Sequence, residues 1–230
     1  MLWMAVLPLL FVMSCKDDDP APADGKFAEL STYLIDNSLD IDNVISGWIT
    51  AAPDQAGVAA FIANNHIFDI RSAADFATGH IEGAVNTTLG NIVADAANVT
   101  KPIIVVCYSG QSAGHATVAL RLSGHTDAKV LKWGMSGWTS ADGYDKWSGA
   151  TSSFAVGDPN WTLPASPATS AGFNYPEISS TASGAELLAE RVAALTSGGF
   201  KGVASTDVVG TPTNYFINNY WAEADNTEYG

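Results

Sequence analysis

Cys107 is the residue whose type and surroundings most clearly indicate chemistry. It follows residues 103–106, four β-branched residues that predict a strand buried on both faces, as in a parallel sheet. After a short turn-forming stretch, residues 113–122 have the apolar spacing of a helix. We therefore expect the Cys107 sulfur at the carboxyl end of a strand, where backbone N–H groups and the positive end of a helix dipole face it. These surroundings favour the thiolate, which is the nucleophilic form of cysteine.

The other cysteine, Cys15, is expected to carry lipid instead of pairing with Cys107. It follows the apolar run 2–13, which is too short to span a bilayer but has the length of a signal-peptide core. Residues 12–15 (Val-Met-Ser-Cys) resemble the bacterial lipobox, whose cysteine is lipidated and becomes the mature N-terminus. Residues 16–19 (Lys-Asp-Asp-Asp) resemble the acidic tether of surface-exposed lipoproteins in Bacteroidetes-like bacteria, and an ordinary solvated linker is the alternative.

This interpretation makes residues 1–15 a lipoprotein signal peptide and predicts a lipid-anchored membrane protein of the cell envelope. The periplasm, the outer membrane and the cell surface all stay open as its location. No Lys or Arg precedes the apolar run, so we expect the natural start to lie upstream. Once Cys15 carries lipid, Cys107 is the one free thiol of the mature chain, and it is either reactive or a small buried hydrophobic residue.

The composition is that of a globular chain and excludes some classes of partner. The 230 residues are 47% hydrophobic and 15% charged, which suffices for one α/β domain and an additional segment. A net charge of −14, without clustered Lys and Arg, argues against a nucleic-acid partner. The four histidines are scattered without ligand spacing, so we expect neither a metal site nor a cofactor.

Predicted helices and strands alternate along the chain. Helices are expected over 27–41, 55–64, 72–77, 89–97, 113–122 and 134–147, with 42–48 continuing the first helix or forming a second. Strands are expected over 66–71, 84–86, 103–106 and 129–133. Short turns between them imply an α/β fold with parallel strands and crossover helices. Ligands of such sheets bind beyond the carboxyl ends of the strands, which is where Cys107 is expected.

The chain divides into a main domain and a shorter C-terminal part. The predicted segments are a tether over 16–26, a domain over 27–148, a Ser-, Thr- and Pro-rich linker over 149–184, and a final unit over 185–230. Residues 185–195 have the spacing of a helix. Because residues 215–225 resemble residues 65–75, we expect the final unit to be an incomplete second copy of the domain, cut off at Gly230.

Four short stretches within residues 55–148 resemble the motifs of a rhodanese-like sulfurtransferase domain. They are 69–71 (Asp-Ile-Arg), 75–84 (Asp-Phe-Ala-Thr-Gly-His-Ile-Glu-Gly-Ala), 107–112 (Cys-Tyr-Ser-Gly-Gln-Ser) and 134–138 (Gly-Met-Ser-Gly-Trp), in the family's order and spacing. The resemblance implies a parallel sheet of about five strands flanked by helices. It also implies an enzyme that moves a sulfane sulfur from a donor, thiosulfate by default, to a thiol or cyanide acceptor through a persulfide on Cys107.

The loop that follows Cys107 would bind the substrate and the persulfide. A glycine at 110 lets the backbone curl around the sulfur, and hydroxyl groups can donate further hydrogen bonds. The loop residues concerned are Tyr108, Ser109, Gly110, Gln111 and Ser112.

Three other functions compete with this one. A cysteine phosphatase needs an arginine six positions after its cysteine to clamp phosphate, and Ala113 occupies that position, so we exclude it. The loop carries Gln111 where rhodaneses active on thiosulfate often carry a cation, which leaves the donor open. The alternative function is a non-catalytic binding or scaffolding lipoprotein with the rhodanese fold. Redox sensing through sulfenic acid would need a resolving cysteine, and the mature chain contains no second free one.

Several residues outside the loop are candidates for a supporting role. Asp69 and Arg71 either tune the site or pair within the scaffold, and pairing is the preferred interpretation. A structural role is preferred over general-base catalysis for His80, and His115 lies one helical turn beyond Ser112, where it is a candidate for favouring the thiolate. Packing is expected of Trp133 and Trp138.

Overall fold

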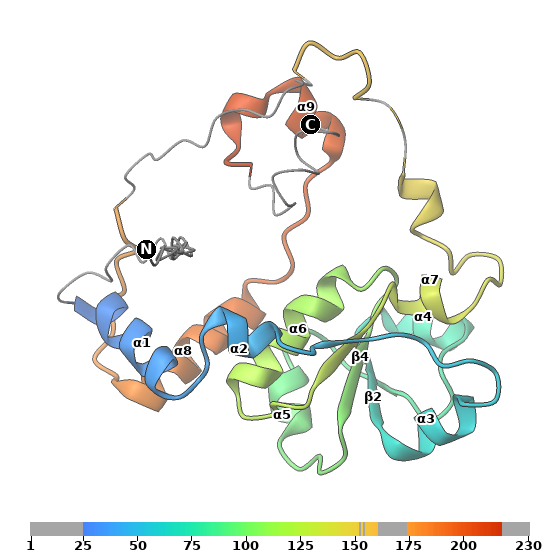
Figure 1. Ribbon diagram of the computed structural model, residues 1–230, viewed down its shortest axis with the longest axis horizontal. Helices are drawn as coiled ribbons and strands as arrows, with labels where there is room; N and C mark the ends of the chain where they lie inside the picture. Colours follow the sequence, from blue (N-terminus) through green and yellow to red (C-terminus); the bar gives the residue numbers. More distant parts are fainter. Residues whose placement is uncertain (1–24, 152, 154, 161–173, 218–230) are drawn as a thin grey trace, which may run out of the picture.

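A five-stranded parallel sheet forms the centre of the described part of the chain (Figure 1). The computed structural model describes residues 25–151, 153, 155–160 and 174–217. The strands are β1 (Ile49–Thr50), β2 (His66–Asp69), β3 (Val85–Asn86), β4 (Ile103–Val106) and β5 (Lys129–Leu131). Their order in the sheet is β1-β5-β4-β2-β3, and every neighbouring pair is parallel. The predicted α/β fold is confirmed, and all carboxyl ends of the strands meet at one edge.

Strand β4 is central because its side chains are apolar on both faces. All four of its residues are buried, and side chains alternate between the faces along a strand. On one face they pack against α5 (Ile92–Ala96) and α6 (Gln111–Leu122). On the other face they pack against α3 (Val58–Asn64) and α7 (Gly134–Trp138). The position of β4 therefore places its following residue, Cys107, in the middle of the sheet edge.

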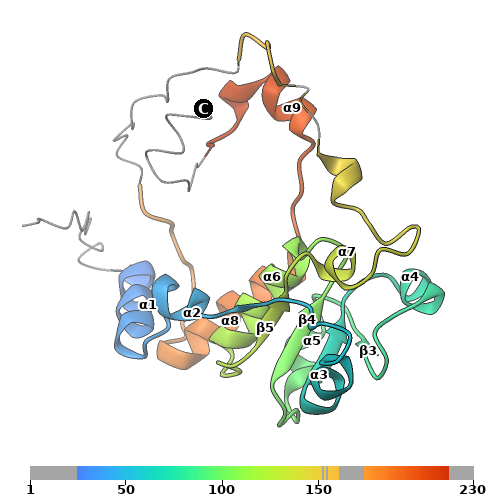
Figure 2. The ribbon, with the colours of Figure 1, turned by 45° about the vertical axis from the view of Figure 1, so that its right-hand side comes forward.

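A second layer of helices covers α6. Helices α1 (Gly25–Asp36) and α8 (Gly184–Ser197) lie side by side, and α8 also contacts α6 (Figures 1 and 2). Buried Leu188 and Val192 of α8 pack against Ala119 of α6. The helix predicted over 185–195 is thus confirmed as a helix, and it packs on the main domain.

The predicted second copy of the domain stays a prediction, because residues 218–225 of the repeat lie outside the described residues. Residues 215–217 follow the turn η2 (Pro212–Asn214) and form no strand. Between α8 and η2, the short helix α9 (Ser205–Gly210) lies apart from the sheet in Figure 1.

Helix ends differ from the predicted ones where the backbone turns. The helix predicted over 27–41 ends at Asp36, because Ser38 adopts a positive φ of 55°. Asp40 then caps α2 (Ile41–Ile45), and its carboxylate accepts a hydrogen bond from the Asn43 N–H at 3.1 Å. The last predicted helix of the domain, 134–147, is too long, because α7 ends at Trp138 and turns lead to η1 (Ser148–Ala150).

Other helices agree with their predicted positions. Helix α4 (Ala73–Thr78) begins after Ser72, whose hydroxyl accepts a hydrogen bond from the Asp75 N–H at 3.1 Å. Strand β1 was not predicted, because two residues are too short to show a periodic pattern.

The predicted signal peptide, the lipidated Cys15 and nearly all of the tether lie outside the described residues. Among the helices that the structure describes, none has the length and apolar character needed to cross a bilayer.

Candidate active site

Cys107 lies directly after β4, where two backbone N–H groups converge on its sulfur. The Gly110 N–H donates to Sγ at 3.1 Å, and the Ala113 N–H donates at 3.4 Å. Gly110 has a φ of +87° and immediately precedes α6, so the loop turns within three residues and presents the helix N-terminus to the sulfur. Cys107 is only 5% exposed. The arrangement predicted from the order of strand, loop and helix is therefore present.

The turn that follows β5 holds this loop from the other side. The Met135 N–H donates to the Cys107 carbonyl at 2.8 Å, and the Ser136 N–H donates to the Tyr108 carbonyl at 3.0 Å. Gly134 has a φ of +55°, and a Cβ there would lie 2.9 Å from the carbonyl carbons of Cys107 and Tyr108. A side chain at position 134 would therefore push the loop after β4 away.

A pocket of about 190 Å³ opens beside the Cys107 thiol. We call it the Cys107 pocket; it is lined by Ile70, Arg71, Ser72, Asp75, Cys107, Tyr108, Ser109, Gln111, Ser112 and Phe200. The structure thus brings together most of the predicted loop and Arg71, while the buried Asp69 lies behind the pocket as the partner of Arg71. Gly110 contributes its N–H to the sulfur. The roles of these residues in binding a substrate stay predictions.

Asp69 and Arg71 form the buried ion pair that the preferred interpretation predicted. Their side chains are each 1% exposed, and Arg71 Nη2 lies 2.7 Å from Asp69 Oδ2. Arg71 Nε donates to both carboxylate oxygens, and Nη2 also donates to the Gly79 carbonyl at 2.7 Å. Burial lowers the pKa of Arg71, but hydrogen bonds to Asp69 and its negative charge outweigh burial, so the pKa lies above its ordinary value. Arg71 is therefore a permanent cation in the pocket wall.

The guanidinium of Arg71 also contacts aromatic rings. Its central carbon lies 5.1 Å from the centroid of the Tyr108 ring and 5.6 Å from that of Tyr144. Its Nη1 is buried without a hydrogen-bond partner among the described residues. A positive charge is thus supplied from the end of β2, although the loop itself carries none.

A carboxylate lies at the rim of the same pocket. The Ser72 hydroxyl donates to Asp75 Oδ2 at 2.6 Å. This hydrogen bond, and next the one from the Tyr108 hydroxyl, lower the pKa of Asp75, so Asp75 is ionised at neutral pH. Burial, followed by the contact with Asp75, raises the pKa of Tyr108, which keeps its hydroxyl protonated as a donor. The pocket therefore presents charges of both signs to a substrate.

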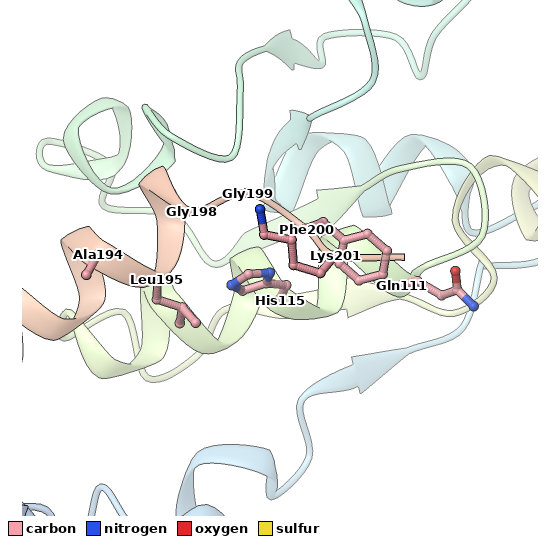
Figure 3. A pocket seen from close by; sticks show the side chains of 8 residues that line it. All are labelled: Gln111, His115, Ala194, Leu195, Gly198, Gly199, Phe200 and Lys201. Atoms are coloured by element: carbon pink, nitrogen blue, oxygen red, sulfur yellow. The ribbon is translucent and has the colours of Figure 1, made fainter. Parts of the chain in front are cut away.

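The other sequence candidates lie away from the thiol. The His80 ring stacks on Phe76 at 3.8 Å, which agrees with a structural role. His115 projects from α6 into a neighbouring groove, and it is not among the residues that line the Cys107 pocket (Figure 3). Trp138 packs against Phe61 with ring centroids 5.8 Å apart. Trp133 packs against Trp147 with ring centroids 4.5 Å apart, and 44% of its surface is exposed.

Four residues that line the pocket are not among the site residues predicted from the sequence: Ile70, Ser72, Asp75 and Phe200. Asp75 lies within one of the recognised motifs but was not assigned a role there. Phe200 follows α8, far along the chain from Cys107, and no local pattern connects the two. Within the described ranges, no group of three or more His, Cys, Asp or Glu residues could hold a metal ion.

Comparison with known proteins agrees with this geometry. Residues 54–141 match the family model described as "Rhodanese-like domain". The "Thiosulfate sulfurtransferase GlpE" of Shewanella oneidensis is 37% identical over 78 residues, which is 33% of this chain and 77% of that protein. The protein of the same name from Pseudomonas aeruginosa is 35% identical over 86 residues, covering 36% of this chain and 77% of the relative. The "Uncharacterized protein YibN" of Escherichia coli is 37% identical over 79 residues, covering 31% and 54%.

Proposed function

Because this chain belongs to the rhodanese-like family of sulfurtransferases, we propose that Cys107 carries a sulfane sulfur as a persulfide. The observation that carries the proposal is the pair of N–H groups from Gly110 and Ala113 that point at the Cys107 sulfur. Donors arranged in advance stabilise negative charge on sulfur, and each contributes about 1–3 kcal/mol to a charged acceptor. They serve the thiolate before the reaction and the persulfide after it.

The reaction takes two steps, in both of which sulfur is the electrophile. The Cys107 thiolate attacks the outer sulfur of thiosulfate; an S–S bond forms, and sulfite leaves with the electron pair of the broken S–S bond. An acceptor, cyanide or a thiolate, then attacks the outer sulfur of the persulfide, and the Cys107 thiolate leaves. Neither step needs an oxidant or a cofactor.

The charges of the Cys107 pocket make thiosulfate the first donor to test. Arg71 places a permanent positive charge in the wall and attracts an anion. Asp75 opposes it at the rim, where its carboxylate repels a second negative charge. A volume of about 190 Å³ accommodates a small inorganic anion. The balance of these charges supports thiosulfate without excluding other sulfane donors.

The test is thiocyanate formation from thiosulfate and cyanide by the full chain. Cys107→Ser should abolish turnover, whereas Cys15→Ser, which removes the other thiol of the chain, should retain it. Incubation with thiosulfate alone should add the mass of one sulfur atom, and Cys107→Ser should remove that adduct. If the parent protein forms no more thiocyanate than Cys107→Ser with every donor, and no adduct forms, the persulfide proposal fails and the non-catalytic binding function is favoured.

We propose in addition that Cys15 is lipidated and anchors the enzyme in the cell envelope. The apolar run 2–13 and the lipobox-like residues 12–15 support this location. A lipid label should enter the protein in cells and should be lost in Cys15→Ser. Protease treatment of intact cells then separates surface exposure from a periplasmic orientation, because only a surface-exposed domain is cleaved.

A further inference from the structure

A second cavity adjoins the Cys107 pocket, and elements outside the rhodanese-like domain form one of its walls. This groove has a volume of about 600 Å³. It lies between α6 and the C-terminal end of α8, and its lining includes Gln111, His115, Leu195, Gly199, Phe200 and Lys201 (Figure 3). Gln111 and Phe200 line both cavities, so the groove lies directly beside the pocket that holds the thiol. We call it the acceptor groove.

The groove combines apolar surface with a cation. Phe200 and Leu195 are 46% and 41% exposed, which is high for large apolar residues beside a thiol pocket. The Phe200 ring packs 6.3 Å from the His115 ring, measured between centroids, and His115 Nε2 is buried without a partner among the described residues. Lys201 adds a positive charge in a chain that has 24 acidic and 10 basic residues.

Packing in the outer helical layer holds this wall in place. Leu188 and Val192 of α8 are buried against α6, so α8 cannot shift without exposing them. After α8, Gly199 has a φ of +71°, and the chain continues alongside α6 so that Phe200 reaches the Cys107 pocket (Figure 3). The wall is thus part of the folded domain, although it lies beyond residues 54–141.

We propose that the acceptor groove binds the body of an organic thiol of low molecular mass that carries a carboxylate. Its apolar part lies against Phe200 and Leu195, its carboxylate faces Lys201, and its sulfur reaches Cys107. Thiosulfate and cyanide are too small to fill a groove three times the size of the pocket, whereas a peptide-sized thiol fills both. This inference rests on the proposed function and names its acceptor class.

The transfer step balances without another reactant. The acceptor thiolate attacks the outer sulfur of the Cys107 persulfide and forms a new S–S bond. The bond between that sulfur and Cys107 breaks, and its electron pair returns to the Cys107 thiolate. The product is the persulfide of the acceptor, which leaves through the groove.

The test compares acceptors that differ in charge, using the full chain and saturating thiosulfate. Glutathione supplies carboxylates, and its diethyl ester removes them from the same body. Lys201→Gln should lower the ratio of kcat/KM for glutathione to kcat/KM for the ester by about 2- to 5-fold, the range of one exposed ion pair. The matched control is Lys129→Gln, which makes the same charge change at the start of β5, on the opposite edge of the sheet. It should leave the ratio as in the parent protein.

The inference is overturned if Lys201→Gln and Lys129→Gln give the same ratio. Phe200→Ala provides a second measurement, because loss of the aromatic wall should raise the KM for glutathione more than the KM for cyanide. Equal changes in the two KM values would also count against the groove. Failure of the proposed function looks different: no thiocyanate forms with cyanide, and no persulfide forms on Cys107.

Discussion

Gly134→Ala should damage both the stability of the domain and the candidate active site, because Gly134 lies against the backbone of Cys107 and Tyr108. A Cβ at this position would lie 2.9 Å from the carbonyl carbons of Cys107 and Tyr108, and closer still to the Cys107 carbonyl oxygen. Backbone atoms cannot rotate away as a flexible side chain can. The turn after β5 and the loop after β4 must therefore separate, and the hydrogen bond from the Met135 N–H to the Cys107 carbonyl lengthens.

The magnitude follows from two costs. A φ of +55° costs an L-residue about 1–2 kcal/mol relative to glycine. Overpacking against an immobile neighbour costs typically about 1–3 kcal/mol more. We therefore expect Gly134→Ala to lower the free energy of unfolding by about 2–5 kcal/mol. Displacement of the Cys107 backbone by a few tenths of an ångström or more should also reduce kcat/KM by about 10- to 100-fold.

The matched control is Gly47→Ala. Gly47 has a φ of +59°, and a Cβ there would have nothing within 4 Å, so it carries the backbone cost without the contact. Urea unfolding of both variants gives the difference in stability, and the thiosulfate–cyanide assay gives the difference in activity. The reasoning is refuted if Gly134→Ala is no less stable than Gly47→Ala, or if it retains the parent activity.

Two further predictions concern buried charged and titratable groups. Asp69→Asn should destabilise the fold by about 3–5 kcal/mol, because it leaves the Arg71 guanidinium buried without a counter-charge. Glu29→Gln, which breaks a partly exposed pair with Lys26, should cost much less in the same urea titration. Burial, and next the charge of Lys101, lower the pKa of His66, so the unfolded chain binds a proton more readily and stability is lost as pH falls below about 6.5. His66→Gln should therefore show a flatter decline in unfolding free energy between about pH 7 and pH 5, with the slope unchanged near pH 8; equal slopes across the acid range would contradict this.

Local patterns in the sequence predicted the elements that carry the site. The β-branched run 103–106 forms the central strand, because a strand of this composition can only be buried on both faces. Ser72 caps α4 as expected, since its hydroxyl needs only an N–H group three residues away. The order of strand, cysteine, turn and helix was enough to place two N–H groups at the sulfur, because that geometry arises within seven residues.

Elements whose ends depend on distant contacts were predicted less well. Two-residue β1 exists because it pairs with β5, and nothing within the strand itself signals it. Helix α8 was recognised by its spacing, but its place against α6 was not, because an apolar helix face does not specify its partner. The sequence analysis assigns α8 to a separate unit over 185–230, whereas the structure packs α8 against α6 of the main domain.

The sequence by itself determined the candidate nucleophile, the loop around it and the fold class, because these follow from residue types at short spacing. Only the tertiary structure decided what surrounds the thiol. Arg71 from the end of β2 and Asp75 from α4 line the Cys107 pocket together with Phe200, which follows α8. Lys201, the next residue, lines the neighbouring groove. Phe200 and Lys201 lie there because apolar side chains of α8 are buried against α6. Such burial depends on the shape and apolar area of whole helices, so the residues around Cys107 do not specify which distant side chains will lie beside it.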